Sequence, residues 1–171
     1  MHTPNLTTSA MSFSSLRFAG IFLSLAVGCA AAPRIENNAI VLDRAFTFAA
    51  GSANLTPESD AAATQLAEFL REKSLLTRIR IEGHVADGES GDAQKLSRAR
   101  ARTVAAKLVA LGVECARLLP VGFGKTKPVA SPASAAANTR IEVKVAALRG
   151  RAIGGLPEDG GGQSAGDPCA P

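Results

Sequence analysis

Two apolar periods alternate along the chain, and this alternation restricts the fold more than any other feature. Apolar residues at every second position predict a strand with one buried face, and apolar residues every three or four positions predict a helix. The strand-like pattern occupies segments 39–48, 77–83 and 139–145, and the short apolar segment 117–121 is a further extended piece. Helical spacing occupies segments 56–70 and 95–111.

The order of these segments is strand, helix, strand, helix, strand, strand. We therefore predict an α+β fold, with a small mixed four-stranded sheet and two helices packed on one face. The first helix is expected to begin at Thr56-Pro57-Glu58, with Thr56 as the N-cap. The second is expected to end before Gly112, because glycine favours a helix C-terminus.

Residues 1–28 have the features of an export signal. Residues 18–28 are uncharged and mostly apolar, follow Arg17 and precede small residues. This apolar stretch is too short to span a membrane, which favours a signal peptide over a membrane helix. Translation from Met11 would leave the signal intact, so the start of the protein stays open between Met1 and Met11.

Two modes of cleavage fit the end of this signal. An ordinary signal peptidase would cut at the small residues around Ala30 and Ala32. Residues 26–29 also resemble a bacterial lipobox, although Ala26 stands where Leu is usual. On this resemblance we predict that Cys29 is lipidated and anchors the protein to outer-membrane lipid, on the periplasmic face.

The rest of the chain divides into three parts. We predict a short tether over 29–38, one domain over 39–149, and a disordered tail over 150–171, where Gly, Pro and Asp cluster without an apolar period. Lipidation of one cysteine would leave an even pair, Cys115 and Cys169, in an oxidising compartment. This pair either forms a disulfide or remains as two thiols.

One charged residue interrupts the apolar face of the second helix. Leu96, Val104 and Leu108 follow helical spacing, and Arg100 lies between them. An ordinary explanation is that Arg100 lies at the edge of the face, extends its charge to solvent or pairs with an acid. A functional explanation is that it binds an anion, since it lies early in the helix, where backbone amides also favour negative charge.

Several short motifs occur together in a fixed order. They are Gly83-His84, Leu96-Ser97-x-x-Arg100-Ala101, Gly122-x-Gly124 and Asn138-x-Arg140-Ile141-Glu142. In this order and spacing, over roughly residues 40–145, the chain resembles the OmpA-like C-terminal domain of the peptidoglycan-associated family. With its lipobox-like N-terminus it is similar to the lipoprotein form of that family.

The resemblance implies non-covalent binding of the peptidoglycan stem peptide. In the family, the Arg of the Leu-Ser-x-x-Arg-Ala motif binds a carboxylate of diaminopimelate and an Asp holds its ammonium group. Arg100 is the matching arginine, but Ala86 occupies the position of the Asp. We therefore expect Asp87 to supply the carboxylate, with Glu89 or Asp92 as less direct candidates.

Two further family positions match this chain. Asn138 and Arg140 are expected to shape the ligand site and to lie near the ligand carboxylates, whereas a simple ion pair between Arg140 and Glu142 is the alternative. A family Asn is replaced here by Ala93. The predicted function is an outer-membrane-anchored lipoprotein that tethers the envelope to peptidoglycan. The alternative is an envelope interaction module, able to contact other envelope proteins, whose peptidoglycan binding is weakened or lost.

Other functional classes fit the sequence poorly. The formal net charge of +4 permits anionic partners, but no aromatic stacking residue accompanies Arg98, Arg100 and Arg102, and export argues against nucleic acid as a partner. His84 is the one histidine outside the signal segment, so neither a metal cluster nor a nucleophilic triad is predicted. We expect no enzyme activity and no cofactor.

Overall fold

The computed structural model describes residues 31–89, 91–133, 136–155 and 159–170. The predicted signal segment and Cys29 lie outside the described residues. The helices are α1 (Ser59–Glu72) and α2 (Ala93–Ala110), with short 3₁₀ helices at Cys115–Arg117 and Ala136–Asn138. The strands are β1 (Arg34–Glu36), β2 (Ala39–Val41), β3 (Leu76–His84), β4 (Leu118–Gly124), β5 (Arg140–Leu148), β6 (Arg151–Ala152) and β7 (Gln163–Ser164).

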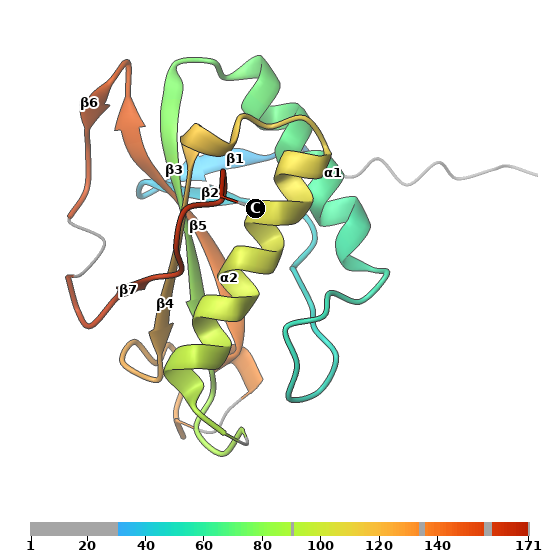
Figure 1. Cartoon of the computed structure of the whole chain (residues 1–171), viewed down its shortest axis with the longest axis vertical. Helices are drawn as coiled ribbons and strands as arrows, with labels where there is room; N and C mark the ends of the chain where they lie inside the picture. Colours follow the sequence, from blue (N-terminus) through green and yellow to red (C-terminus); the bar gives the residue numbers. More distant parts are fainter. Residues whose placement is uncertain (1–30, 90, 134–135, 156–158, 171) are drawn as a thin grey trace, which may run out of the picture.

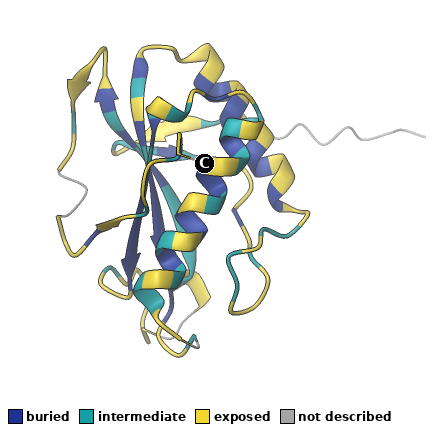
Figure 2. Cartoon of the chain, viewed as in Figure 1, coloured by how far each residue is buried: buried dark blue, intermediate teal, exposed yellow. Residues whose placement is uncertain are grey.

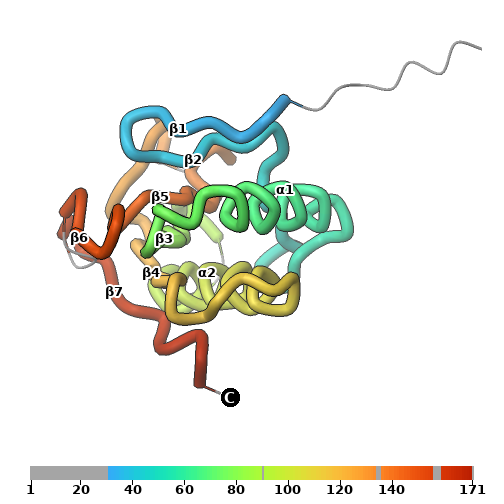
Figure 3. Tube along the Cα trace, turned by 90° about the horizontal axis from the view of Figure 1, so that it is seen from above, coloured from blue at the N-terminus to red at the C-terminus, as the bar shows by residue number. Residues whose placement is uncertain are grey.

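The strands form one mixed sheet in the order β1-β2-β5-β3-β4-β7, and β6 pairs with β5. The central strand β3 runs parallel to β4 and antiparallel to β5. Both helices cover the same face of this sheet, as Figures 1 and 3 show. The predicted α+β class and helix placement are confirmed, but the described sheet is wider than four strands because β1, β6 and β7 extend it.

The core lies between the sheet and the two helices, where Figure 2 shows the buried residues. The face of β3 toward the helices carries Ile79 and Ile81, both fully buried. Leu66 and Leu70 of α1 and Val104 of α2 pack into the same core. The helical and strand-like periods in the sequence therefore mark the buried faces correctly.

The predicted strand over 39–48 is wrong beyond Val41. β2 ends there, and the chain continues as an irregular segment that returns to a single bridge between Phe48 and Leu55. Phe46 is nevertheless only 6% exposed. The apolar alternation thus records which side chains are buried, while the backbone leaves the sheet.

The predicted N-cap of α1 is also wrong. The helix begins at Ser59, and the N-cap position is held by Glu58 without a side-chain hydrogen bond to the backbone. The hydroxyl of Thr56 instead contacts the hydroxyl of Thr47, and Ser59 Oγ donates to the Thr47 carbonyl at 2.9 Å. These contacts fix the segment before α1 against Thr47, beside the candidate site.

Helix α2 is held close to the sheet, and this determines where its side chains point. Asp92 is the N-cap and accepts hydrogen bonds from the amides of Gln94 and Lys95. A Cβ at Gly83 would collide with the Ser97 carbonyl, so only glycine allows this approach of strand and helix. Ser97 Oγ accepts a hydrogen bond from the Gly124 amide at 2.9 Å, which ties the same helical turn to β4.

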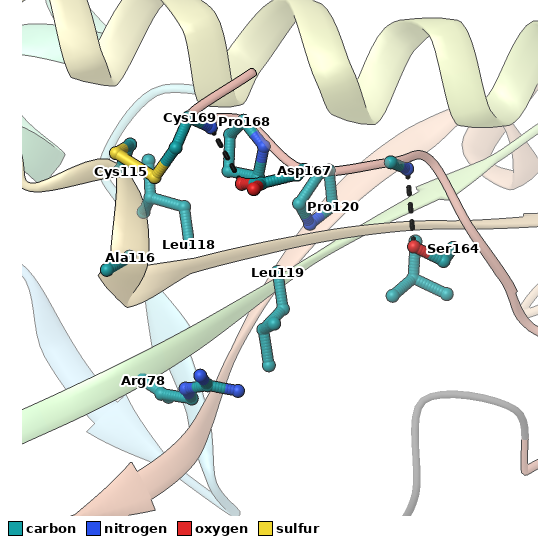
Figure 4. A pocket seen from close by; sticks show the side chains of 12 residues that line it. Arg78, Cys115, Ala116, Leu118, Leu119, Pro120, Ser164, Asp167, Pro168 and Cys169 are labelled. Carbon is teal, nitrogen blue, oxygen red and sulfur yellow. Dashed lines mark hydrogen bonds between the residues drawn. A yellow bond between two sulfur atoms is a disulfide. The ribbon is translucent and has the colours of Figure 1, made fainter.

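The structure contradicts the predicted disorder of the tail in the parts that it describes. β6 forms an antiparallel pair with β5, and β7 pairs with the outer edge of β4 (Figure 1). A disulfide between Cys115 and Cys169 then fixes the end of the tail beside that edge (Figure 4). No apolar period predicts this order, because it depends on backbone pairing and a cross-link to distant residues.

The predicted tether is likewise wrong from Arg34 onward. Residues 34–36 form β1, which pairs with β2 through a hairpin at Asn37 and Asn38. Both asparagines have positive φ, 47° and 65°, which is the backbone conformation that a two-residue hairpin turn requires. The first described strand therefore begins five residues after Cys29 in the sequence.

Candidate functional site

A pocket of about 630 Å³ lies beside the N-terminal half of α2. The loop that follows β3 forms one wall with Asp87, Gly88 and Glu89, and the segment 46–48 forms another. Arg100 of α2 and Thr139, the residue before β5, also line the pocket. The pocket therefore joins four segments that are distant in the sequence, and it contains two of the predicted site residues, Arg100 and Asp87.

The side chain of Arg100 is fixed on every side. It is only 2% exposed, and its Nε donates to the Ser52 carbonyl at 2.9 Å. Its terminal nitrogens donate to the Glu89 carboxylate, at 3.1 Å from Nη1 and 2.8 Å from Nη2. The guanidinium carbon lies 5.1 Å from the centre of the Phe48 ring, a cation–π contact. The interruption in the apolar face of α2 is thus a buried arginine that pairs with an acid.

Glu89 has the features of an internal ligand of this arginine. Its side chain is 21% exposed, and it also accepts a hydrogen bond from the Thr139 hydroxyl. Burial raises the pKa of Glu89, but the hydrogen bonds from Arg100 and Thr139 outweigh burial and lower that pKa overall. Glu89 is therefore held as a carboxylate, in the two-point geometry that arginine offers to a carboxylate.

Asp87, the acid that the sequence favoured, lies at the rim of the pocket. It forms an exposed ion pair with Lys125 at 2.6 Å, and hydrogen bonding to Lys125 lowers the pKa of Asp87. It is not hydrogen-bonded to Arg100. The acid beside the arginine is instead Glu89, which the sequence named only as a less direct candidate.

Asn138 shapes the neighbouring loop. It is 2% exposed, its Oδ1 accepts the amides of Val129 and Ala130, and its Nδ2 donates to the Ala133 carbonyl at 2.9 Å. That carbonyl also accepts the amide of Asp87. The side-chain amide of Asn138 is fully used within the chain, so its contribution to the pocket is to hold the loop in place.

Arg140 is outside this pocket. Its side chain lies on the sheet face away from the helices and pairs with Glu142, with Nη2 to Oε1 at 2.5 Å. Glu142 also pairs with Lys144 at 2.7 Å. Burial raises the pKa of Glu142, but the two cations outweigh it and lower that pKa to about 2. The ion pair that the sequence left as the alternative for Arg140 is the one that forms.

The same sheet face contains a largely buried cluster that the sequence did not indicate. Ligand atoms of Glu82, His84 and Glu142 lie within 4.8 Å of one another. The two carboxylates already bind Arg80, Arg140 and Lys144, so positive charge surrounds the cluster and opposes a metal cation. Among the described residues, no hydrogen-bond partner reaches either ring nitrogen of His84, whose ring stacks on Phe123 at 5.3 Å.

A second hollow lies under the tail. It measures about 550 Å³, and its lining comes from β4, from the end of the tail and from the disulfide (Figure 4). Arg78 is the cation in this lining and Asp167 the acid. Within the described part of the chain, no helix is both long and apolar enough to cross a membrane.

Comparisons with known proteins identify the domain that carries the pocket. The model of the OmpA family matches residues 47–142, more than half of the chain. Outer membrane porin F of Pseudomonas aeruginosa is 37% identical over 126 residues, which cover 70% of this chain and 34% of the porin. The chain thus spans about a third of the length of this relative.

Two solved structures have the same fold. The OmpA-like domain of FopA1 from Francisella tularensis is 25% identical with a TM-score of 0.56, over 68% of this chain and 79% of that one. The peptidoglycan-associated lipoprotein from Burkholderia pseudomallei is 30% identical with a TM-score of 0.50, over 60% of this chain and 88% of that one. The chain therefore belongs to the OmpA family.

Proposed function

We propose that this protein binds peptidoglycan without cleaving it, through the pocket at Arg100. The observation that carries the proposal is the guanidinium of Arg100, which Ser52 and Phe48 hold in place while both terminal nitrogens engage a carboxylate inside a pocket. Glu89 occupies that position within the chain. A carboxylate of the stem peptide would take the same two hydrogen bonds.

Binding is an exchange of partners. The ligand carboxylate replaces Glu89 on Arg100, and the released Glu89 accepts the ammonium group at the same end of diaminopimelate. A zwitterionic end leaves neither Arg100 nor Glu89 without a partner, whereas a plain carboxylate would leave Glu89 unpaired. Asp87 at the rim is a second acceptor for the ammonium group once it leaves Lys125. Asn138 positions the loop, and Arg140 takes no direct part.

The similarity to a peptidoglycan-associated lipoprotein supports an envelope location. We propose that lipid on Cys29 anchors the protein in the outer membrane, facing the periplasm. The first strand begins at Arg34, so the anchored domain stays close to the membrane surface. The protein then links that membrane to the cell wall.

A second candidate is an interaction module that keeps the fold without the ligand. One observation favours it: each of the four predicted ligand residues already has a partner within the chain. Arg100 pairs with Glu89, Asp87 with Lys125 and Arg140 with Glu142, while Asn138 binds backbone. In this case the pair of Arg100 and Glu89 would only stabilise the fold, and the domain would contact other envelope proteins.

Titration of the protein with a diaminopimelate-containing tripeptide, followed by NMR, separates the two candidates. We expect amide shifts centred on residues 86–89 and on Arg100, and no saturable shifts with Arg100→Ala. Arg71→Ala removes one exposed arginine from α1 and should bind as the wild type does. If the wild type shows no saturable shifts in the pocket, the interaction module is the correct function.

A further inference from the structure

A second cationic region lies on the opposite side of α2 from Arg100. Lys95, Arg98 and Arg102 line a hollow of about 440 Å³ between α2 and residues 164–166 of the tail. The three side chains are spaced i, i+3 and i+7, so they share one helical face over about 10 Å. Ala99 lies between them and also lines the hollow, which we call the α2–tail groove.

The cations of the α2–tail groove form no ion pair in the described parts of the chain. Two lysines elsewhere on the surface do form ion pairs: Lys107 pairs with Asp60, and Lys125 pairs with Asp87. Hydrogen bonds from backbone amides lower the pKa of Asp92, and its electrostatic interaction with Arg98 and Lys95 helps to lower it, but Asp92 forms no ion pair with them. The hydrogen bonds of two acids near the groove go to backbone amides. Asp92 caps α2, and Asp167 accepts the amide of Cys169 through its side chain.

The tail builds the second wall of this groove. The pairing of β7 with β4 and the disulfide at Cys169 fix residues 164–166 beside α2. Gly166 has a φ of 91°, which favours glycine, and a Cβ at that position would lie 3.4 Å from Arg102 Nη1, so the tail turns directly beside Arg102. The helix thus holds three like charges close together, and the cross-linked tail forms a fixed wall beside them. A bound anion would stabilise this arrangement.

We propose that the α2–tail groove is a second binding site of this domain, for carboxylate groups of the acidic wall polymer. This inference rests on the proposed function, because it takes peptidoglycan as the polymer. Arginine and lysine in one groove suit several carboxylates along a chain, and they do not require the ammonium group that the pocket at Arg100 requires.

The position of the groove favours the wall over the membrane. In Figure 3 α2 and the end of the tail lie on the opposite side of the domain from β1. The predicted anchor at Cys29 precedes Arg34 by five residues, which reach at most about 18 Å. The edge with β1 therefore lies next to the membrane, and the groove faces away from it. Two sites on two sides of one helix can hold a polymer together more strongly than either site alone.

The test is co-sedimentation of the full-length mature protein with purified sacculi at several salt concentrations. The groove variant is Lys95→Gln/Arg98→Gln/Arg102→Gln. Its matched control is Arg44→Gln/Arg71→Gln/Arg151→Gln, which removes three exposed cations that lie apart from the groove. We expect the groove variant to bind about tenfold more weakly and with less dependence on salt, and the control to change less than about twofold. Equal binding by the two triple variants would overturn the proposal.

Two further measurements separate this proposal from the function of the pocket. Arg100→Ala should keep a weak, salt-sensitive binding to sacculi that the groove substitutions abolish. If Arg100→Ala binds as the wild type does while the groove variant does not, the pocket fails and the groove stands. Flotation with vesicles containing phosphatidylglycerol is the control for membranes. Tighter binding to these vesicles than to sacculi, lost in the groove variant, would reject the wall as the partner.

Discussion

The two sides of α2 use arginine in opposite ways. Arg100 is almost fully buried, and its nitrogens are occupied by Glu89 and Ser52. Arg102, half a turn further on, is exposed and has no acidic partner in the described structure. Burying a charge costs desolvation free energy, and few arrangements of partners compensate for that cost. An exposed charge stays hydrated, attracts ligands from a distance and is screened by salt.

This difference separates two tasks that binding to a polymer combines. The pocket at Arg100 can discriminate, because a ligand must replace Glu89 with a matching arrangement of charges. The α2–tail groove can attract, because its cations are already free to meet any carboxylate chain. The comparison depends on the order of the tail and on the strength of the buried pair, and each is open to measurement.

The largest expected effect concerns the wall of the groove. Cys115 and Cys169 are 54 residues apart, and a cross-link over a loop of this length stabilises a domain by about 4 kcal/mol in the chain-entropy model. Cys115→Ser/Cys169→Ser should lower the free energy of unfolding, measured by urea titration, by up to that amount. The tail should also become accessible to protease, while NMR shifts of the pocket at Arg100 stay in place.

Reduction of the wild type with dithiothreitol should reproduce the double serine variant, which excludes an effect of the substitutions themselves. A reduced protein with unchanged stability and an uncut tail would mean that β7 alone holds the tail against β4. In that case the groove would not depend on the disulfide.

The next largest effect concerns the buried pair. Glu89→Ala leaves Arg100, which is 2% exposed, without its acidic partner. The loss of one partner from a buried ion pair lowers the free energy of unfolding by about 3 kcal/mol. Urea unfolding should show this loss. The double variant Arg100→Leu/Glu89→Leu should recover most of it, because neither charge then remains buried alone.

The exposed pair of Asp87 and Lys125 is the matched comparison for this cycle. Asp87→Ala should lower the free energy of unfolding much less than Glu89→Ala does, because both side chains of the exposed pair remain in water. Equal losses of unfolding free energy in Glu89→Ala and Asp87→Ala would mean that water hydrates Arg100 when Glu89 is absent. The two sides of α2 would then differ less than the structure indicates.

The sequence predicts the positions of the elements better than the partners of the charges. The apolar periods locate both helices and strands β3 and β5, because each period reports burial that the element itself creates. The same period singles out Arg100, because its charge interrupts the apolar face of α2. The choice of Glu89 over Asp87 was not predictable, since it depends on the path of a loop that turns at Gly88, with a φ of 93°.

The same limit explains the errors at the two ends of the domain. β1 and β7 are short strands whose order comes from pairing with β2 and β4, and neither has an apolar period of its own. The asparagine pair at residues 37–38 was a usable signal, because two such residues favour a tight hairpin turn. For the tail, the even pair of cysteines was the only clue, and the sequence left their pairing open.

The smallest expected effect is a dependence of stability on pH. It tests the contribution of Glu142, an acid outside the pocket, against that of acids such as Glu89 inside it. The pKa of Glu142 is lowered from 4.5 to about 2 in the folded protein. A lowered pKa means that its contribution, about 2 kcal/mol, is complete above the unfolded value and is lost as pH falls from about 4.5 toward 2. Urea unfolding at pH 7, 4 and 2.5 should show this loss, and Glu142→Gln should reduce its slope. An equal slope in Glu142→Gln would assign the acid sensitivity to Glu82 and Glu89, whose pKa values are also lowered.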